Sequence, residues 1–173
     1  AVALADKLET LVGIWGIGLI PTGDKDPYAL RRAALGVLRM LMNSPLSIND
    51  LLRTVAAQFP QDLLAANTVS EVADFMQARL AVLLQNDYAQ DTVAAVLAQR
   101  PDRLDDLADK LQAVESFKKL PEAAALAAAN KRVHNLLKKA DAELGAAQEN
   151  LLQEEAERAL FAATQALRPT VQN

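Results

Sequence analysis

Hydrophobic residues recur along this chain with the period of an α-helix. In the segment Val2–Trp15 the apolar positions are Leu4, Leu8, Leu11, Val12 and Trp15, which share one helix face. A glycine-rich stretch and then Pro21 follow, and they indicate the end of this helix. No segment alternates as a β-strand does, so the pattern predicts an all-α protein built from multi-helix bundles.

The segment Tyr28–Met42 is apolar on nearly all sides. A helix of this kind is typical of the inside of a bundle. Asp26 followed by Pro27 predicts its start, because a carboxylate caps free N–H groups and proline already has a helical φ.

Capping residues and prolines divide the rest of the chain into shorter helices. Ser47 with Asp50 resembles a weakened capping box, and we expect Thr68 or Ser70, then Asp91 and Asp102, to open later helices. The expected helices cover residues 47–58, 61–66, 69–84, 91–99, 102–120, 121–139 and 150–167, with a loop at 140–149 and Pro169 after the last helix.

Composition supports this fold and narrows the function. Hydrophobic residues make up 51% of the chain and aromatic residues only 4%, which favours helices over strands. The net charge of −4 excludes a bulk nucleic-acid binder, so any RNA contact must come from local basic patches. We see no signal peptide, and the apolar run Leu11–Ile20 is too short for a bilayer, so we expect a cytoplasmic protein without a membrane partner.

Residues for catalysis or metal binding are missing from the sequence. Cysteine is absent and His134 is the single histidine, which excludes a zinc cluster and leaves no plausible nucleophile–histidine pair. Gly13, Gly16 and Gly18 follow a helix rather than a strand, so close backbone packing is favoured over nucleotide binding. We therefore expect no catalytic residue, no metal ligand and no cofactor in this chain.

The best local signal is a basic stretch between residues 118 and 139. It holds Lys118, Lys119, Lys131, Arg132, Lys138 and Lys139 against Glu122 alone. On a helical wheel the cations and Asn135 share one arc, while the opposite arc is apolar and is expected to pack. The candidate RNA-binding residues are Lys131, Arg132, Asn135, Lys138 and Lys139; the alternative is a solvated outer face.

A second set of cations lies near the N-terminal third. Lys25, Arg31, Arg32 and Arg39 are candidates for secondary RNA or interface contacts. The alternative is that the arginines pair with Asp24, Asp26 or other acids. The loop 22–27 itself could contact a phosphate or metal, or form a capped turn with solvated charges.

Several segments resemble one known family. Residues 5–11 (ADKLETL) and 18–39 (GLIPTGDKDPYALRRAALGVLR) resemble the middle of the β subunit of bacterial heterotetrameric glycyl-tRNA synthetase. Residues 100–119, 122–137 (EAAALAAANKRVHNLL) and 151–160 (LLQEEAERAL) are similar to segments that follow, the latter two within its anticodon-binding domain.

The resemblance implies a domain order and a function. Residues 1–60 would be the later part of an HD-like helical domain, 61–119 a connecting helical region, and 120–173 an incomplete anticodon-binding domain. The chain would be the tRNA-recognition part of a glycine–tRNA ligase. Its partners would be glycine tRNA and the α subunit, which uses ATP, in an α2β2 heterotetramer.

Two other hypotheses remain open. The first is a structural module that docks the α subunit without touching RNA, through the apolar helix 28–42. The second is a remnant of an HD-type phosphohydrolase, in which Asp6 would stand where a metal-binding aspartate falls. No histidine lies near Asp6 to complete such a site, so the resemblance implies no catalytic role here.

Overall fold

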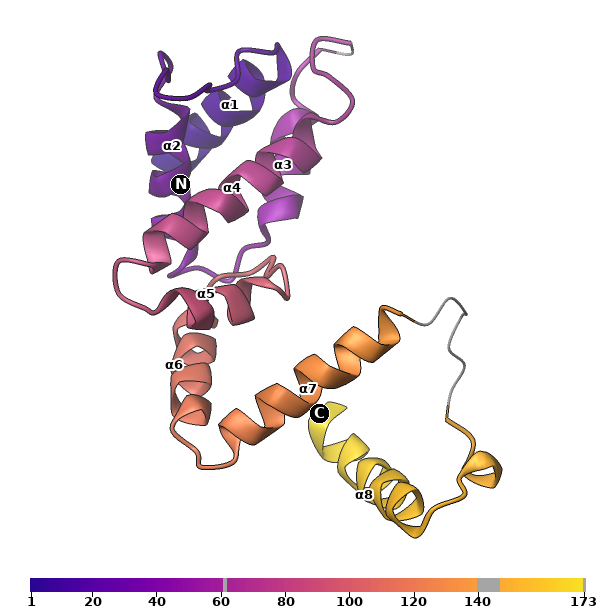
Figure 1. Ribbon diagram of the computed structural model, residues 1–173. Coiled ribbons are helices and arrows are strands. Elements are labelled where there is room, and N and C mark those ends of the chain that lie inside the picture. Colours follow the sequence, from indigo (N-terminus) through magenta and orange to yellow (C-terminus); the bar gives the residue numbers. More distant parts are fainter. Residues whose placement is uncertain (61, 140–146, 173) are drawn as a thin grey trace. The chain divides into compact units, whose positions relative to one another are not determined.

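The computed structural model describes residues 1–60, 62–139 and 147–172, and these residues form helices joined by turns (Figure 1). The elements are α1 (Val2–Gly16), α2 (Leu30–Leu41), α3 (Ile48–Ala56), α4 (Thr68–Leu84), α5 (Gln90–Leu97), α6 (Leu107–Lys118), α7 (Ala123–Leu137), a 3-10 turn η1 (Glu149–Leu151) and α8 (Glu155–Gln172). Among the described residues there is no strand, only one isolated bridge between Thr22 and Lys25. The predicted all-α class is confirmed.

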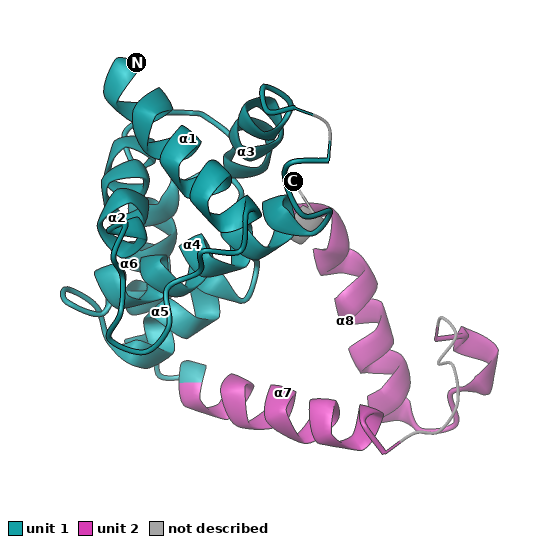
Figure 2. Ribbon diagram, turned by 90° about the horizontal axis from the view of Figure 1, so that it is seen from above, with its two compact units in different colours: residues 1–123 teal, residues 124–173 magenta. Residues whose placement is uncertain are grey.

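The chain divides into two compact units, residues 1–123 (unit 1) and 124–173 (unit 2), shown in teal and magenta in Figure 2. The sequence-based HD-like and anticodon-binding assignments are not tested by this division and stay predictions. No helix in the described parts of the chain is both long and apolar enough to cross a membrane.

The core of unit 1 is built by α1 to α4, with α5 and α6 packed together beside α4. Leucines are the most frequent residues in it, beside valines, Trp15 and a methionine, and Leu11, Leu38, Leu52 and Met76 are fully buried. The apolar face of α2 is part of this core and packs against α1 and α4. The hypothesis that this helix docks a partner through its apolar face is therefore wrong, because unit 1 already covers that face.

Close packing explains the glycines of α1. A Cβ on Gly13 would lie 2.9 Å from the ring of Phe59, and one on Gly16 would overlap the side chain of Leu64. Gly18 has a φ of +83°, a backbone conformation that suits glycine. The interpretation as packing positions is confirmed for Gly13 and Gly16. It is wrong for Gly18, where a Cβ would meet no atom within 4 Å and the positive φ accounts for the glycine.

The start of α2 differs from the prediction. The helix begins at Leu30, and Pro27 lies in a turn before it. Asp26 still accepts hydrogen bonds from the backbone N–H groups of Leu30 (2.8 Å) and Arg31 (2.9 Å). The carboxylate caps the helix from four residues upstream, because Ala29 takes a left-handed conformation with φ of 54° between them.

The start of α3 is capped from a distant part of the chain. Ser47 caps the N–H of Asp50 (3.0 Å), as predicted. Asp102, predicted to open its own helix, instead accepts from the N–H of Asn49 (2.9 Å) and from the hydroxyl of Ser47. The helix expected at 102 therefore begins only at Leu107.

One other predicted helix and the predicted caps of α4 and α5 are wrong, although α4 and α5 themselves lie close to the predicted ranges. The helix expected at 61–66 is absent over residues 62–66, which form turns. Thr68 and Ser70 do not cap α4; their hydroxyls donate to the carbonyls of Ala65 and Asn67. Asp91 lies inside the first turn of α5, where its carboxylate accepts from the N–H of Thr92.

Unit 2 also departs from the pattern at its C-terminal end. Asn150 lies in the 3-10 turn, and α8 begins at Glu155, where the Glu157 carboxylate accepts the N–H groups of Gln153 (2.9 Å) and Glu154 (3.2 Å). Pro169 lies within α8 instead of following it, three residues before the helix ends. The predicted loop over 140–149 falls mostly on residues 140–146, outside the described residues.

Candidate nucleic-acid interface

Helix α7 carries the main candidate site. Its first two turns are almost all alanine, the residue with the highest helix propensity, and its basic residues follow in the last two turns. Cations near a helix C-terminus are stabilised by the helix dipole. The sequence therefore favours both the helix and the position of its charges.

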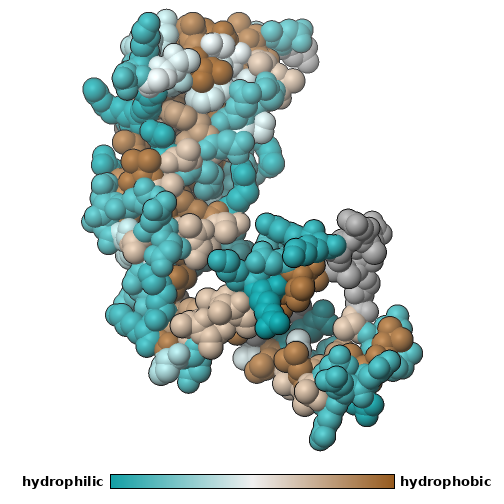
Figure 3. Space-filling model, viewed as in Figure 1, coloured by the Kyte–Doolittle hydropathy of each residue, from teal (hydrophilic) through white to brown (hydrophobic). Residues whose placement is uncertain are grey.

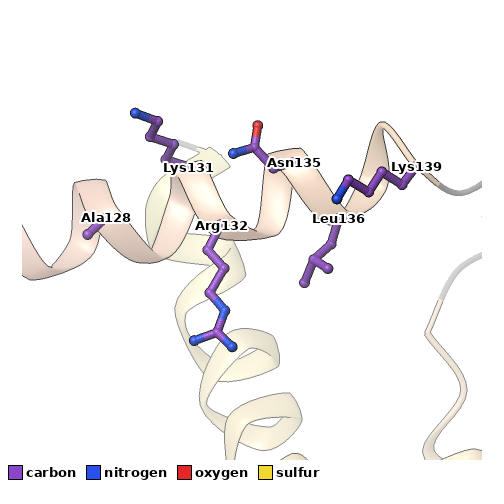
Figure 4. A pocket seen from close by; sticks show the side chains of 6 residues that line it. All are labelled: Ala128, Lys131, Arg132, Asn135, Leu136 and Lys139. Atoms are coloured by element: carbon purple, nitrogen blue, oxygen red, sulfur yellow. The ribbon is translucent and has the colours of Figure 1, made fainter.

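Four of the five predicted RNA-binding residues line one shallow, open groove (Figure 4). Lys131, Arg132, Asn135 and Lys139 form it together with Ala128 and Leu136. Lys138 is not part of this lining and lies in the turn after α7, where its N–H donates to the carbonyl of His134. All five side chains are exposed, and none forms an ion pair with an acid in the described part of the chain.

The charged side chains spread around the helix. In Figure 4, Lys131 and Asn135 point to one side of α7, whereas Arg132 and Leu136 point to the other. This follows from helical spacing, since residues four apart share a face and adjacent residues are turned by about 100°. An extended polyanion can contact such a surface, but one small anion cannot meet all three cations at once.

The apolar face of α7 is not packed, contrary to the prediction. Leu126, Val133, Leu136 and Leu137 are each about half exposed or more, and Leu136 reaches 61%. Leu160 of α8 is also exposed, and Figure 3 shows hydrophobic atoms at the surface in brown and tan. The periodicity was a correct indication of an amphipathic helix, but burial depends on a covering element that the described residues of unit 2 do not supply.

Lys118 belongs to a different arrangement from the other cations of the basic stretch. Its ammonium group contacts Asp91 (2.9 Å), Glu115 (3.5 Å) and the hydroxyl of the buried Thr92 (3.0 Å). The hydrogen bond with Asp91 raises the pKa of Lys118 and lowers the pKa of the Asp91 carboxyl, while the Thr92 hydroxyl lowers the pKa of Glu115. Lys118 therefore ties α6 to α5.

The four cations of the second set fall into two pairs with different contacts. The guanidinium of Arg31 donates to the carbonyl of Gly23, and Lys25 forms the backbone bridge with Thr22, so both stabilise the turn before α2. Arg32 and Arg39 are exposed and form no ion pair within the described residues. The alternative in which these arginines pair with Asp24 or Asp26 is therefore wrong.

One neighbouring cation was missed from the sequence. The side chain of Lys7, on α1, lies against Gly36, and a Cβ at that glycine would lie 3.0 Å from Lys7 Cδ and Cε. Gly36 follows Arg32 by one helical turn and precedes Arg39 by almost one. A glycine inside a helix was the available signal, because it costs about 0.5–1 kcal/mol relative to alanine and so needs a packing reason.

Metal chemistry has no support in the described ranges. No group of three or more histidine, cysteine, aspartate or glutamate side chains is placed to hold an ion there. Asp6 is exposed, and its backbone carbonyl accepts a bond from the hydroxyl of Thr10 within α1. The described residues thus define an all-helical protein with a cationic helix as its candidate site.

Comparison with known proteins gives the family. A family model described as "Glycyl-tRNA synthetase beta subunit" matches residues 1–98. The chain is 75% identical over 171 residues to the "Glycine--tRNA ligase beta subunit" of Neisseria meningitidis serogroup B, and 52% identical over 173 residues to that of Ralstonia nicotianae. These matches cover 99% and 98% of this chain and 25% of each relative. The chain belongs to the glycyl-tRNA synthetase β-subunit family and spans about a quarter of the length of the curated relatives it matches.

Proposed function

We propose that this chain is the tRNA-handling part of a glycine–tRNA ligase β subunit, and that α7 contacts the tRNA backbone. The observation that supports this most strongly is the groove of α7, in which Lys131, Arg132 and Lys139 are exposed and free of acidic partners within the described residues. Lysine and arginine side chains bind phosphates by charge and position the RNA, while a neighbouring amide such as Asn135 can hydrogen-bond an unstacked base.

The whole-protein context is part of the same proposal. We place residues 1–60 in an HD-like domain and residues from 120 in an anticodon-binding domain, with 61–119 between them. The α subunit of an α2β2 assembly in the cytoplasm would bind ATP and carry out aminoacylation. This chain's own role is to hold glycine tRNA in register for that reaction.

The experiment is fluorescence anisotropy of labelled glycine tRNA, titrated with the protein at several salt concentrations beside a non-cognate tRNA. Lys131→Ala and Arg132→Ala are each expected to weaken binding. Each should also reduce the slope of log K against log salt by about 0.7–0.9, because each lost phosphate contact releases one counterion fewer.

Arg168→Ala is the matched control. It removes one positive charge from the same unit, on α8, without touching the groove. Its slope should stay at the wild-type value. If Lys131→Ala and Arg132→Ala leave both affinity and slope unchanged, α7 is not the RNA contact.

A second candidate function is docking of the α subunit by unit 2. The exposed leucines of α7, with Leu136 at 61%, favour it, because exposed apolar faces mark protein interfaces. Leu126→Ser together with Leu137→Ser should then abolish co-elution with the α subunit in the absence of RNA. Unchanged co-elution of this variant would exclude α7 as the docking surface.

A further inference from the structure

We propose that Lys7, Arg32 and Arg39 form a second phosphate-contacting surface, on unit 1, which binds the RNA backbone without reading its sequence. This proposal rests on the proposed RNA-binding function and extends it to a site distinct from α7. We call these three residues the α1–α2 cationic stripe.

The stripe depends on the packing of two helices. Arg32 and Arg39 lie two turns apart on the outer face of α2, and Gly36 lies between them on the same face. The aliphatic part of Lys7 crosses from α1 over Gly36, which leaves Lys7 half-buried. A long side chain can bury its methylene groups in this way while its ammonium stays in water.

The charge of the stripe is not neutralised locally. Helix α2 contains no acidic residue between Leu30 and Leu41, and the residues that share the Lys7 face of α1 (Leu4, Thr10, Leu11 and Ile14) carry no charge. In the ranges that the structure describes, none of the three cations forms an ion pair or a side-chain hydrogen bond. Elsewhere in unit 1, Arg53, Arg103 and Lys110 each pair with a nearby aspartate.

The spacing of the stripe fits a nucleic-acid strand. Arg32 and Arg39 are seven residues apart, which is about 10 Å along the helix axis, with Lys7 at an intermediate level. One strand of a duplex carries a phosphate about every 3 Å along its axis, so this length meets about three phosphates. Three cations spread over this distance can each contact a different phosphate of one strand, which favours a polyanion as the ligand.

The test uses the full-length β subunit together with its α subunit, and labelled glycine tRNA between 50 and 200 mM KCl. The triple variant Lys7→Gln, Arg32→Gln, Arg39→Gln is expected to bind with a salt slope lower by about 2–3. Over this fourfold range of salt, the wild-type affinity should therefore fall about 16- to 64-fold more than that of the variant.

The matched control removes the same charge from paired positions. The variant Arg53→Gln, Arg103→Gln, Lys110→Gln lowers the charge of unit 1 by three as well, but each of these cations already has an aspartate partner at 3.4, 2.7 or 2.6 Å. The slope of log K against log salt for this control variant should be lower than the wild-type slope by less than one. Equal slopes in the two triple variants would overturn the proposal, because the effect would then depend on net charge alone.

A charge-neutral variant tests the packing itself. Gly36→Leu places four carbons where the Lys7 methylenes lie, so Lys7 must move away while the net charge is unchanged. Circular dichroism checks that the helices remain. A slope lower by about 0.9 supports the stripe, and an unchanged slope removes Lys7 from it.

The α7 variants make the two proposals distinguishable. If Lys131→Ala and Arg132→Ala lower the slope but the stripe variant does not, the stripe is overturned and the proposed function stands. If the stripe variant lowers the slope and the α7 variants do not, RNA binding belongs to unit 1 and the role of α7 is overturned. If neither changes the slope, both proposals are wrong.

Discussion

Replacement of Asp102 by alanine should destabilise unit 1, because the Asp102 side chain caps α3, a helix that begins more than fifty residues earlier in the chain. The Asp102 carboxylate accepts hydrogen bonds from the Asn49 N–H (2.9 Å), the Asn49 amide (2.7 Å) and the Ser47 hydroxyl. The Ile48 N–H donates to the Asp102 backbone carbonyl (2.9 Å), which the substitution leaves in place. Alanine therefore leaves the Asn49 N–H and two side chains without this acceptor.

The magnitude follows from the bonds that are lost. Loss of a side-chain cap costs about 0.5–2 kcal/mol, and a bond to a charged group is worth about 1.5–3 kcal/mol when it is not exposed to water. Asp102 is only partly buried, so we expect a total near 2 kcal/mol. With a urea m-value of about 1.5–2 kcal/mol per molar, the midpoint should fall by about 1 M.

The assay is urea unfolding followed by tryptophan fluorescence. Trp15 is the only tryptophan and is 9% exposed in the core of unit 1, so its signal reports this unit alone. Asp105→Ala is the control, because it removes an exposed ion pair with Arg103 (2.7 Å) that should contribute less than about 1 kcal/mol. If both variants shift the midpoint equally, Asp102 does not act as a cap for α3.

The same site predicts a pH dependence. Burial raises the pKa of Asp102, but the hydrogen bonds from Ser47 and Asn49 together outweigh burial and lower the pKa below the value of 3.8 in an unfolded chain. A carboxyl with a lowered folded pKa stabilises fully above the unfolded value and loses this effect as the pH falls through the folded one. The stability difference between the wild type and Asp102→Asn should be constant from pH 7 to 5 and should shrink below pH 4. A constant difference down to pH 3 would contradict this assignment.

Three further substitutions test the packing of unit 1, each by thermal or urea unfolding. Gly16→Val should lower the free energy of unfolding by about 1–3 kcal/mol, because the valine side chain would overlap Leu64. A variant as stable as the wild type would show that this contact is not tight. Gly36→Ala should raise the free energy of unfolding by about 0.5–1 kcal/mol, because alanine favours the helix and the flexible end of Lys7 can move aside. A loss of stability would mean that Lys7 cannot move. Thr92→Val should cost about 1 kcal/mol by removing the buried hydroxyl that bridges α5 and α6, and equal melting temperatures would contradict that role.

The sequence was a good guide to features that depend on near neighbours. Helical periodicity placed Leu11 in the core, and the capping pattern identified Ser47 as the N-cap of α3. The local excess of lysine and arginine identified α7 as a basic helix, and its cations are exposed in the structure. The prediction that they share one arc is less accurate, because Arg132 points away from Lys131. Each of these features arises within one or two helical turns, where spacing along the chain fixes spacing in space.

The same reasoning failed where a residue finds its partner far along the chain. Asp102 looked like the cap of the helix that follows it, yet it caps α3. Lys118 belongs by sequence to the basic stretch 118–139, yet it pairs with Asp91 on α5. In both cases the charged side chain can bond either to a near neighbour or to a residue far along the chain. Helix packing decided which of these partners lies within bonding distance.

Helix propensity and periodicity are local properties, so the all-helical class, the apolar faces that fill the core of unit 1 and the cationic character of α7 are all predictable from the residues alone. Helix packing sets which cations have no acidic partner among the described residues. It tied Lys118 to acids, left Arg32 and Arg39 exposed, and brought Lys7 over Gly36 from another helix. Charge pairing depends on distances of a few ångströms between side chains, and for residues remote in sequence only the folding of the chain sets these distances.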